Sequence, residues 1–530
     1  MQRESLPMAS LHEVQSEAVA VPATSVPSLL TALVNANAVA APEASRRDHP
    51  AVQAWLQASE NGSAAEQICV WMQLRPGDTV RLDRIRRSLS RDIARIDQLL
   101  SRQVNQILHA PEFQALESSW RGLHYLWTTR RDLLSGQGLE SEKVEVQIRV
   151  LNVSKRELKR NFDAAGEFDQ NELFRKVYEE EFGTPGGTPY GVLLANYEFT
   201  NHPDDIDLLT QLSEVGAAAF APVITAASPS LLGMDEFSVL EQSPDLTAIF
   251  KQARLLKWRS LRERVDTQFL GLTLPRILMR RPYGDSDAES HSFRFIEDVG
   301  DGTRKQFLWG NSAWALGAVL LRAFVTTGWF ADIRGVEQGV EGGGLVTNLP
   351  AYEFQTDSPG AATRSSVEVA ISETLDVDLC SLGFIPLSHC KDTEFSVFYS
   401  NQSVHQPVKY TDPESTANAR ISAMLQYVLC CSRIAHYVKV HVREKIGSIV
   451  PAEKIQSDIK AWLVDYIVAN ERARPEIKAR YPLREADVTV DEVPGKPGEY
   501  SMTLRLLPHY QLDQLTSSMT LLARRVEFKQ

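Results

Sequence analysis

A long series of apolar residues, spaced three or four apart over residues 82–108, constrains the fold most. This spacing matches the 3.6-residue turn of an α-helix and puts the apolar side chains on one helical face. Pro111 marks a break, and a second amphipathic helix is predicted over residues 111–127. The first face consists of Ile85, Leu89, Ile93, Ile96, Leu100, Val104 and Ile107; the second consists of Phe113, Leu116, Trp120, Leu123 and Trp127.

Strand patterns alternate with further helices, which predicts the α/β class. Apolar residues at every second position indicate a strand over residues 144–150, and residues 192–195 form a short apolar strand candidate. Residues 312–324 are predicted to be a core helix, and residues 415–445 a long helix that buries Cys431. A C-terminal hairpin offers an edge to which another chain can add. Its candidate inter-subunit strand residues are Val488, Val490, Tyr500, Met502, Leu504 and Leu506.

Composition limits the classes of function. The 530 residues are 43% apolar and 23% charged, which is typical of globular proteins with a sizeable core. A net charge of −12 gives no support to a nucleic-acid partner. Five cysteines without a CxxC pair indicate reduced thiols in a cytoplasmic protein. The N-terminus lacks a secretory signal pattern, and the most apolar helix candidate is too short for membrane insertion.

We expect three regions: a flexible N-terminal arm over residues 1–80, an α/β region over residues 81–410, and helices plus a β-hairpin over residues 411–530. The arm contains one short amphipathic helix. Two interpretations of this helix remain open: it docks into a partner's groove, or it packs on its own chain. Its residues are Ser28, Leu29, Leu30, Leu33 and Val34.

Residues 378–410 hold most of the candidate catalytic side chains. We interpret Leu382 to Leu387 as a buried strand and residues 395–399 as its half-buried partner after a turn. The chain has no HExxH, GxSxG, Walker-type loop or paired CxxC, so we predict no enzyme, no cofactor and no metal site. An enzyme that uses Cys390 or His389 is the alternative. The other candidates in the stretch are Cys380 and His405.

Two other segments favour structural roles. The glycine-rich segment over residues 183–191 lacks the Gly-Lys-Ser/Thr ending of a phosphate loop and is predicted to be a turn. Arg276, Arg280 and Arg281 lie among apolar residues, which favours a strand edge with ion pairs over phosphate contacts.

Several of these stretches resemble the large subunit of the type VI secretion contractile sheath, the TssC/VipB/ImpC family. The resemblance extends in family order over roughly residues 82–526. The segment DIARIDQLLSRQVNQILH (92–109) is also similar to a divergent second group of these subunits. The resembling segments include PEFQALESSWRGL (111–123), EEEFGTPGGTPYG (179–191), FLWGNSAWA (307–315) and SRIAHYVKVHVREKIG (432–447).

The resemblance implies a phage tail sheath-like protomer without enzymatic activity. Such a subunit pairs with a small sheath subunit (TssB/VipA) and polymerises with neighbouring protomers around the Hcp tube. The sheath grows from a baseplate, contracts to propel the tube, and is disassembled by the ClpV ATPase. The family's N-terminal helix recruits ClpV, and its Ser-Leu-Leu start matches Ser28, Leu29 and Leu30. An accessory or baseplate-associated protein that does not polymerise is the alternative.

Overall fold

The computed structural model divides the chain into two compact units. The first comprises residues 1–108 and 283–298, and the second comprises residues 109–282 and 299–530. All the named strands lie in the second unit. The structure describes residues 53–57, 64–72, 81–136, 144–182, 184, 186–284, 293, 295–300, 304–336, 342–352, 365–391, 393–443, 451–470, 473–492, 500–509 and 519–521.

The first unit contains the helices α4 (Ala64–Trp71) and α5 (Leu82–Leu108), and the predicted bounds of α5 are confirmed. The Trp71 indole Nε1 donates a hydrogen bond of 3.0 Å to Asp92 Oδ2 on α5. Asp92 is buried, whereas most of α5 is exposed or half-buried. The contact with α4 therefore covers only a small part of this amphipathic helix.

The centre of the second unit is a parallel sheet of four strands, in the order β1, β2, β3, β7. Its strands are short apolar runs, and β2 and β3 are buried at every position. Continuous burial is typical of a parallel sheet with both faces covered. The strands are β1 (Leu193–Phe199), β2 (Val223–Ala227), β3 (Leu270–Leu274) and β7 (Ile385–Pro386), which confirms the predicted strand that includes residues 193–195.

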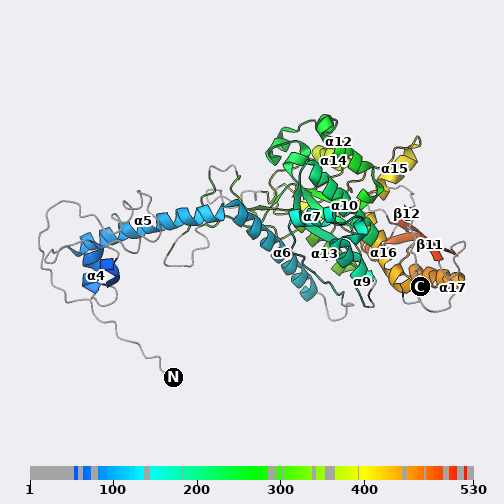
Figure 1. The fold of residues 1–530 in the computed structure, drawn as a ribbon, viewed down its shortest axis with the longest axis horizontal. Helices are drawn as coiled ribbons and strands as arrows, with labels where there is room; N and C mark the ends of the chain where they lie inside the picture. Colours follow the sequence, from blue (N-terminus) through cyan, green and yellow to red (C-terminus); the bar gives the residue numbers. More distant parts are fainter. Residues whose placement is uncertain are drawn as a thin grey trace, which may run out of the picture. The chain divides into compact units, whose positions relative to one another are not determined.

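Two hydrophobic cores cover the opposite faces of this sheet. Successive strand residues point to opposite faces, and Val223 belongs to one core while Ile224 belongs to the other. The first core contains residues of α10 (Pro203–Ala219) and α12 (Leu256–Glu263). The second contains α13 (Ala313–Thr327), the predicted core helix. The sheet is therefore the middle layer of an α/β body (Figure 1).

A third core joins the C-terminal elements to this body. The predicted hairpin is confirmed, because β10 and β11 pair in antiparallel orientation and β12 extends the sheet beyond β11. The helix predicted over residues 415–445 is in fact two helices, since Leu425 N donates to Asn401 O (2.7 Å) where the first helix ends. The elements are α15 (Pro413–Ser422), α16 (Leu425–Arg443), α17 (Ala452–Val464), β10 (Leu483–Glu492), β11 (Tyr500–Pro508) and β12 (Met519–Leu521) (Figure 1).

The remaining elements connect these layers or pack on them. They include a π-helical turn over Arg175–Glu179 and several 3-10 turns. The helices among them are α6 (Pro111–Gly136), α7 (Lys155–Ala164), α8 (Glu172–Phe174), α9 (Glu180–Phe182), α11 (Leu246–Phe250), α14 (Glu373–Ser381) and α18 (Pro475–Arg480). The 3-10 turns cover Phe168–Gln170, Pro229–Leu232, Phe237–Gln242, Ala253–Leu255 and Val265–Phe269, and the short strands are β4 (Ile277–Leu278), β5 (Trp309–Gly310), β6 (Leu345–Val346), β8 (Ser388–His389) and β9 (Ser396–Val397).

The strand predicted over residues 144–150 is wrong. These residues form no β-ladder with any other described part of the chain. Their alternation is present in part, since Val146 is buried between the exposed Glu145 and Gln147, whereas Val150 is exposed. The Val146 carbonyl accepts from Arg130 Nε of α6 (2.8 Å). The apolar alternation indicates which side of the segment faces the rest of the second unit. A β-strand also needs a neighbouring strand with which to pair.

The interpretation of residues 378–410 as one strand, one turn and a partner strand needs correction. β7 joins the parallel sheet, while β9 pairs with β8 and β6 in a separate antiparallel sheet. The turn itself lies where it was expected, between β8 and β9, with Cys390 N donating to Phe395 O (3.0 Å). Strand character is visible in the sequence, but the partner of each strand depends on the tertiary fold.

Candidate interaction surfaces

The candidate catalytic side chains of residues 378–410 contact different parts of the fold. Cys380 Sγ lies 3.9 Å from Asp376 Oδ2, and burial raises its pKa to about 12, so the thiol stays protonated near neutral pH. Cys390 Sγ lies 3.8 Å from Tyr399 Oη, and His405 Nδ1 lies 2.9 Å from the Arg264 carbonyl. Burial is also the main cause that lowers the pKa of His389. In these contacts the four side chains contribute to the packing of the folded chain.

The cysteines of α16 are also packing groups. Cys430 and Cys431 are buried in the third core, and burial raises the pKa of Cys430 to about 12. His436 Nε2 lies 2.9 Å from the Ala219 carbonyl, and burial lowers the pKa of the imidazole to about 3. Among the described residues, no three His, Cys, Asp or Glu side chains gather as metal ligands would.

Arg276 and Arg280 form ion pairs beside the short strand β4, as predicted. Arg276 forms a bidentate pair with Glu198 of β1 (2.6 and 2.7 Å), and Arg280 Nε contacts Glu117 of α6 (2.8 Å). A second carboxylate, Glu368, lies 3.7 Å from Arg276, and burial raises its pKa to about 7. The network ties α6 and β1 to the short strand β4.

Glu368 makes the stability of this network depend on pH. The folded chain holds the Glu368 proton up to about pH 7, whereas the unfolded chain releases it near pH 4.5, so the contribution of Glu368 to stability is lost as pH rises between these values. We expect Glu368→Gln to be more favourable at about pH 8 than at about pH 4, by up to roughly 3 kcal/mol in the free energy of unfolding. Denaturant titrations at both pH values measure the difference. An equal effect at both would contradict the assignment.

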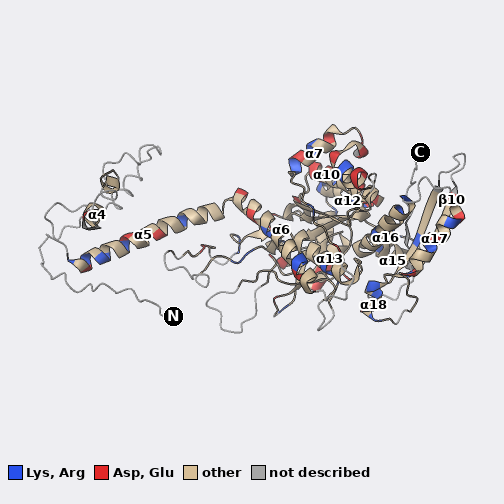
Figure 2. Ribbon diagram, turned by 90° about the horizontal axis from the view of Figure 1, so that it is seen from below, with Lys and Arg blue, Asp and Glu red and all other residues tan. Residues whose placement is uncertain are grey.

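The first candidate interaction surface is the exposed apolar side of α5, here called the α5 stripe. Ile93 is 56% exposed and Ile107 is 53% exposed, which is unusual for isoleucine in a globular protein. Basic residues occupy much of the rest of this helix (Figure 2). The α5 stripe consists of Ile93, Leu100 and Ile107; the basic residues are Arg84, Arg86, Arg87, Arg91, Arg95 and Arg102, against the acidic residues Asp83, Asp92 and Asp97.

The second candidate surface lies on α6 and is here called the α6 face. One side of α6 packs on α13, where Gly122 lets the Trp314 indole approach the helix backbone. Another side is apolar and exposed, and Trp120 retains 65% of its accessible surface. Contiguous exposed apolar groups of this size mark interaction sites. The α6 face consists of Phe113, Leu116, Trp120 and Trp127.

The third candidate surface is the C-terminal hairpin. Val488, Val490, Leu504 and Leu506 point into the third core, and Met502 packs partly against it. Tyr500 pairs with Glu492 at the turn end of the hairpin. β10 is an edge strand of this sheet. Its first residue, Leu483, bridges to Ile467, and Val490 N donates to Gln456 Oε1 of α17 (3.4 Å), but in the described part of the chain no strand pairs along the rest of its outer side. An edge of this kind can accept a further strand.

The predicted arm helix lies outside the described residues, so the role of Ser28, Leu29, Leu30, Leu33 and Val34 stays a prediction. The division into residues 1–80, 81–410 and 411–530 also stays a prediction. None of the helices in the described ranges combines the length and the hydropathy that a membrane span requires.

Comparisons with known proteins identify relatives over most of the chain. Residues 90–405 match the tail sheath N-terminal domain of the EvpB/VC_A0108 family, and residues 414–525 match its tail sheath gpW/gp25-like domain. The chain is also 41% identical over 441 residues to the "Type VI secretion system sheath protein TssC1" of Pseudomonas aeruginosa strain PAO1. That alignment covers 83% of this chain and 86% of the relative.

Proposed function

We propose a mechanical role for this chain on the premise that it belongs to the EvpB/VC_A0108 tail sheath family. The chain is a large subunit of the type VI secretion contractile sheath, and it polymerises with the small sheath subunit and with neighbouring protomers. In such a polymer, contraction is a change of packing between bodies that stay folded. The family is structural, and the role proposed for this chain involves no catalysis.

The exposed apolar side of α5 is the observation that supports a specific docking site. Its large side chains repeat at helical spacing along a helix of 27 residues, of which the described neighbours cover little. Burying such a stripe releases roughly 25 cal/mol per Å² of apolar surface. We propose that a helix of the small subunit pairs with the α5 stripe, and that acidic residues beside its own stripe face the arginines of α5.

Substitution of the α5 stripe tests this docking site. We expect Ile93→Glu combined with Leu100→Glu to abolish co-purification of the small subunit, because two carboxylates would have to be buried in an apolar helix pair. The matched control is Gln98→Glu combined with Gln106→Glu, which adds the same charge to polar exposed positions of the same helix.

The two double variants also test the sheath role. Wild type and the Gln98/Gln106 control should form tubules with the small subunit in the electron microscope, whereas the Ile93/Leu100 variant should not. Normal tubules from the Ile93/Leu100 variant would place the small subunit elsewhere. A wild-type heterodimer that never forms tubules would support the alternative of an accessory or baseplate-associated protein.

We also propose that the hairpin joins neighbouring protomers. Addition of a neighbour's strand to the edge of β10 would link protomers through backbone hydrogen bonds while their bodies rotate during contraction. The buried residues Val488, Val490, Leu504 and Leu506 would hold the hairpin on its own body, so the edge, and not these side chains, is the contact.

The remaining partners follow from the same role. We propose that the assembled cytoplasmic sheath encloses the Hcp tube, starts at a baseplate, and presents the arm helix beginning at Ser28 to ClpV after contraction. The Ser-Leu-Leu start of that helix supports the last point. Binding of ClpV to contracted sheaths, with and without residues 1–40, is the measurement that decides it, and equal binding would contradict the assignment.

A further inference from the structure

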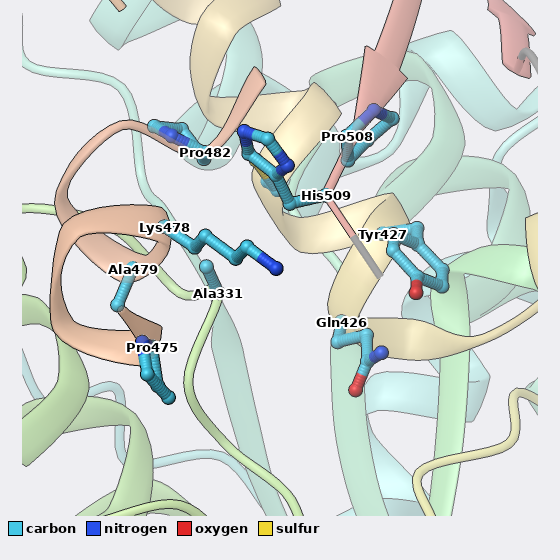
Figure 3. Close-up of a pocket in the computed structure, with 10 residues that line it drawn as sticks. Ala331, Gln426, Tyr427, Pro475, Lys478, Ala479, Pro482, Pro508 and His509 are labelled. Atoms are coloured by element: carbon cyan, nitrogen blue, oxygen red, sulfur yellow. The ribbon is translucent and has the colours of Figure 1, made fainter. Parts of the chain in front are cut away.

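A small pocket opens among the C-terminal elements of the second unit, away from the three surfaces described above. Its volume is about 90 Å³, which corresponds to roughly three water molecules or one small organic acid. The start of α16, the helix α18 and the end of β11 contribute its walls (Figure 3). The lining residues that carry the argument are Gln426, Cys430, Lys478, Pro482, Pro508 and His509.

Much of the lining is apolar or proline, so its few polar atoms determine what can bind. Gln426 is 3% exposed, and its Oε1 is enclosed without a hydrogen-bond partner in the described part of the chain. The Nε2 of His509 is buried without a partner in the same sense. A buried polar atom left unpaired is costly, so both positions favour a ligand that can form hydrogen bonds.

Lys478 gives the pocket its charge. Its ammonium extends toward the side of the pocket on which Gln426 and Tyr427 lie (Figure 3). The lining contains no Asp or Glu, and among the described residues Lys478 forms no ion pair. The pKa of His509 is lowered, mainly by burial and also by the charge of Lys478, which keeps the imidazole neutral near pH 7. The pocket therefore presents one positive charge and no negative charge.

We propose that this pocket binds a carboxylate. Lys478 supplies the counter-charge, and the Gln426 amide, whose oxygen and nitrogen exchange places by a half-turn, donates an N–H to the second carboxylate oxygen. The unpaired His509 Nε2 is the third polar group that lines the pocket. One Lys and a volume of this size suit a monoanion with a short carbon chain better than a phosphate dianion. The carboxylate belongs either to a free short-chain acid or to an Asp or Glu side chain of a neighbouring protomer.

Acetate is the probe for the first source. We expect sodium acetate to raise the thermal stability of the purified full-length chain in a saturable way, relative to sodium chloride at the same ionic strength. Lys478→Met and Gln426→Leu should each weaken acetate binding at least about tenfold, because each removes one charged or donated hydrogen bond. The control is Lys454→Met, which replaces an exposed lysine of α17 outside the pocket and should bind acetate like the wild type.

Sheath assembly tests the second source. If acetate leaves the unassembled chain unchanged, a carboxylate from a neighbouring protomer predicts shorter or fewer tubules for Lys478→Met and normal tubules for Lys454→Met. The proposal is overturned if neither acetate binding nor tubule formation distinguishes the Lys478 variant from the Lys454 variant. Failure of the wild type to form tubules would instead count against the proposed sheath role, and the acetate measurement does not depend on that role.

Discussion

Phe384→Ala is expected to destabilise the body of the subunit severely and to abolish sheath assembly. The Phe384 ring is fully buried in the first core, stacks on Trp258 with ring centroids 5.4 Å apart, and meets Phe250 edge-on at 5.8 Å. Removing a buried phenylalanine costs about 3–5 kcal/mol, because apolar contact is lost and a cavity remains. Native domains are stable by only about 5–15 kcal/mol, so this loss is a large fraction of the total.

The measurement is the free energy of unfolding from denaturant titration, followed by electron microscopy of tubules with the small subunit. Tyr399→Ala is the matched control, because it deletes an aromatic ring from the same stretch of chain at a position that is 45% exposed. We expect the control to lose about 1 kcal/mol or less and to assemble. A Phe384 variant as stable as the control would mean that this core does not hold the strand β7 in place.

The parts of the fold that were predictable from sequence are those set by local pattern. The bounds of α5 follow from the spacing of its apolar residues and from Pro111, and the hairpin follows from two alternating runs around a Gly/Pro turn. The extended segment over residues 144–150 shows the limit of such arguments. Part of its alternation is present in the structure, but a strand requires a partner. Contacts between residues distant in sequence decide which segments become neighbours.

The candidate surfaces and the pocket differ in the same way. The apolar series on α5 and α6 were visible in the sequence, but a helical period does not tell whether a face meets the core or solvent, and both helices keep such side chains exposed. The pocket gave no sequence signal. Gln426, Lys478 and His509 come from three separate elements, with no spacing that a motif could describe.

Gly122→Ala is expected to destabilise the chain, although alanine favours helices. An added Cβ at Gly122 would lie 2.6 Å from Cδ1 of Trp314 and closer still to Nε1 and Cε2 of the same ring. The ring cannot swing away freely, because its Nε1 donates to Asn196 Oδ1 (3.2 Å). Alanine gains about 0.5–1 kcal/mol in helix propensity, whereas overpacking costs about 1–3 kcal/mol, so the steric term should exceed the gain.

Gly136→Ala separates helix propensity from steric overlap. Gly136 is the last residue of the same helix, and no atom lies within 4 Å of its added Cβ. It should match the wild type or exceed its stability slightly. A loss of stability by Gly122→Ala alone would show that the close packing of α6 on α13 contributes to the stability of the body. Equal stability of the two variants would mean that the Trp314 ring moves aside, and that the close contact between Trp314 and Gly122 does not fix the position of α6.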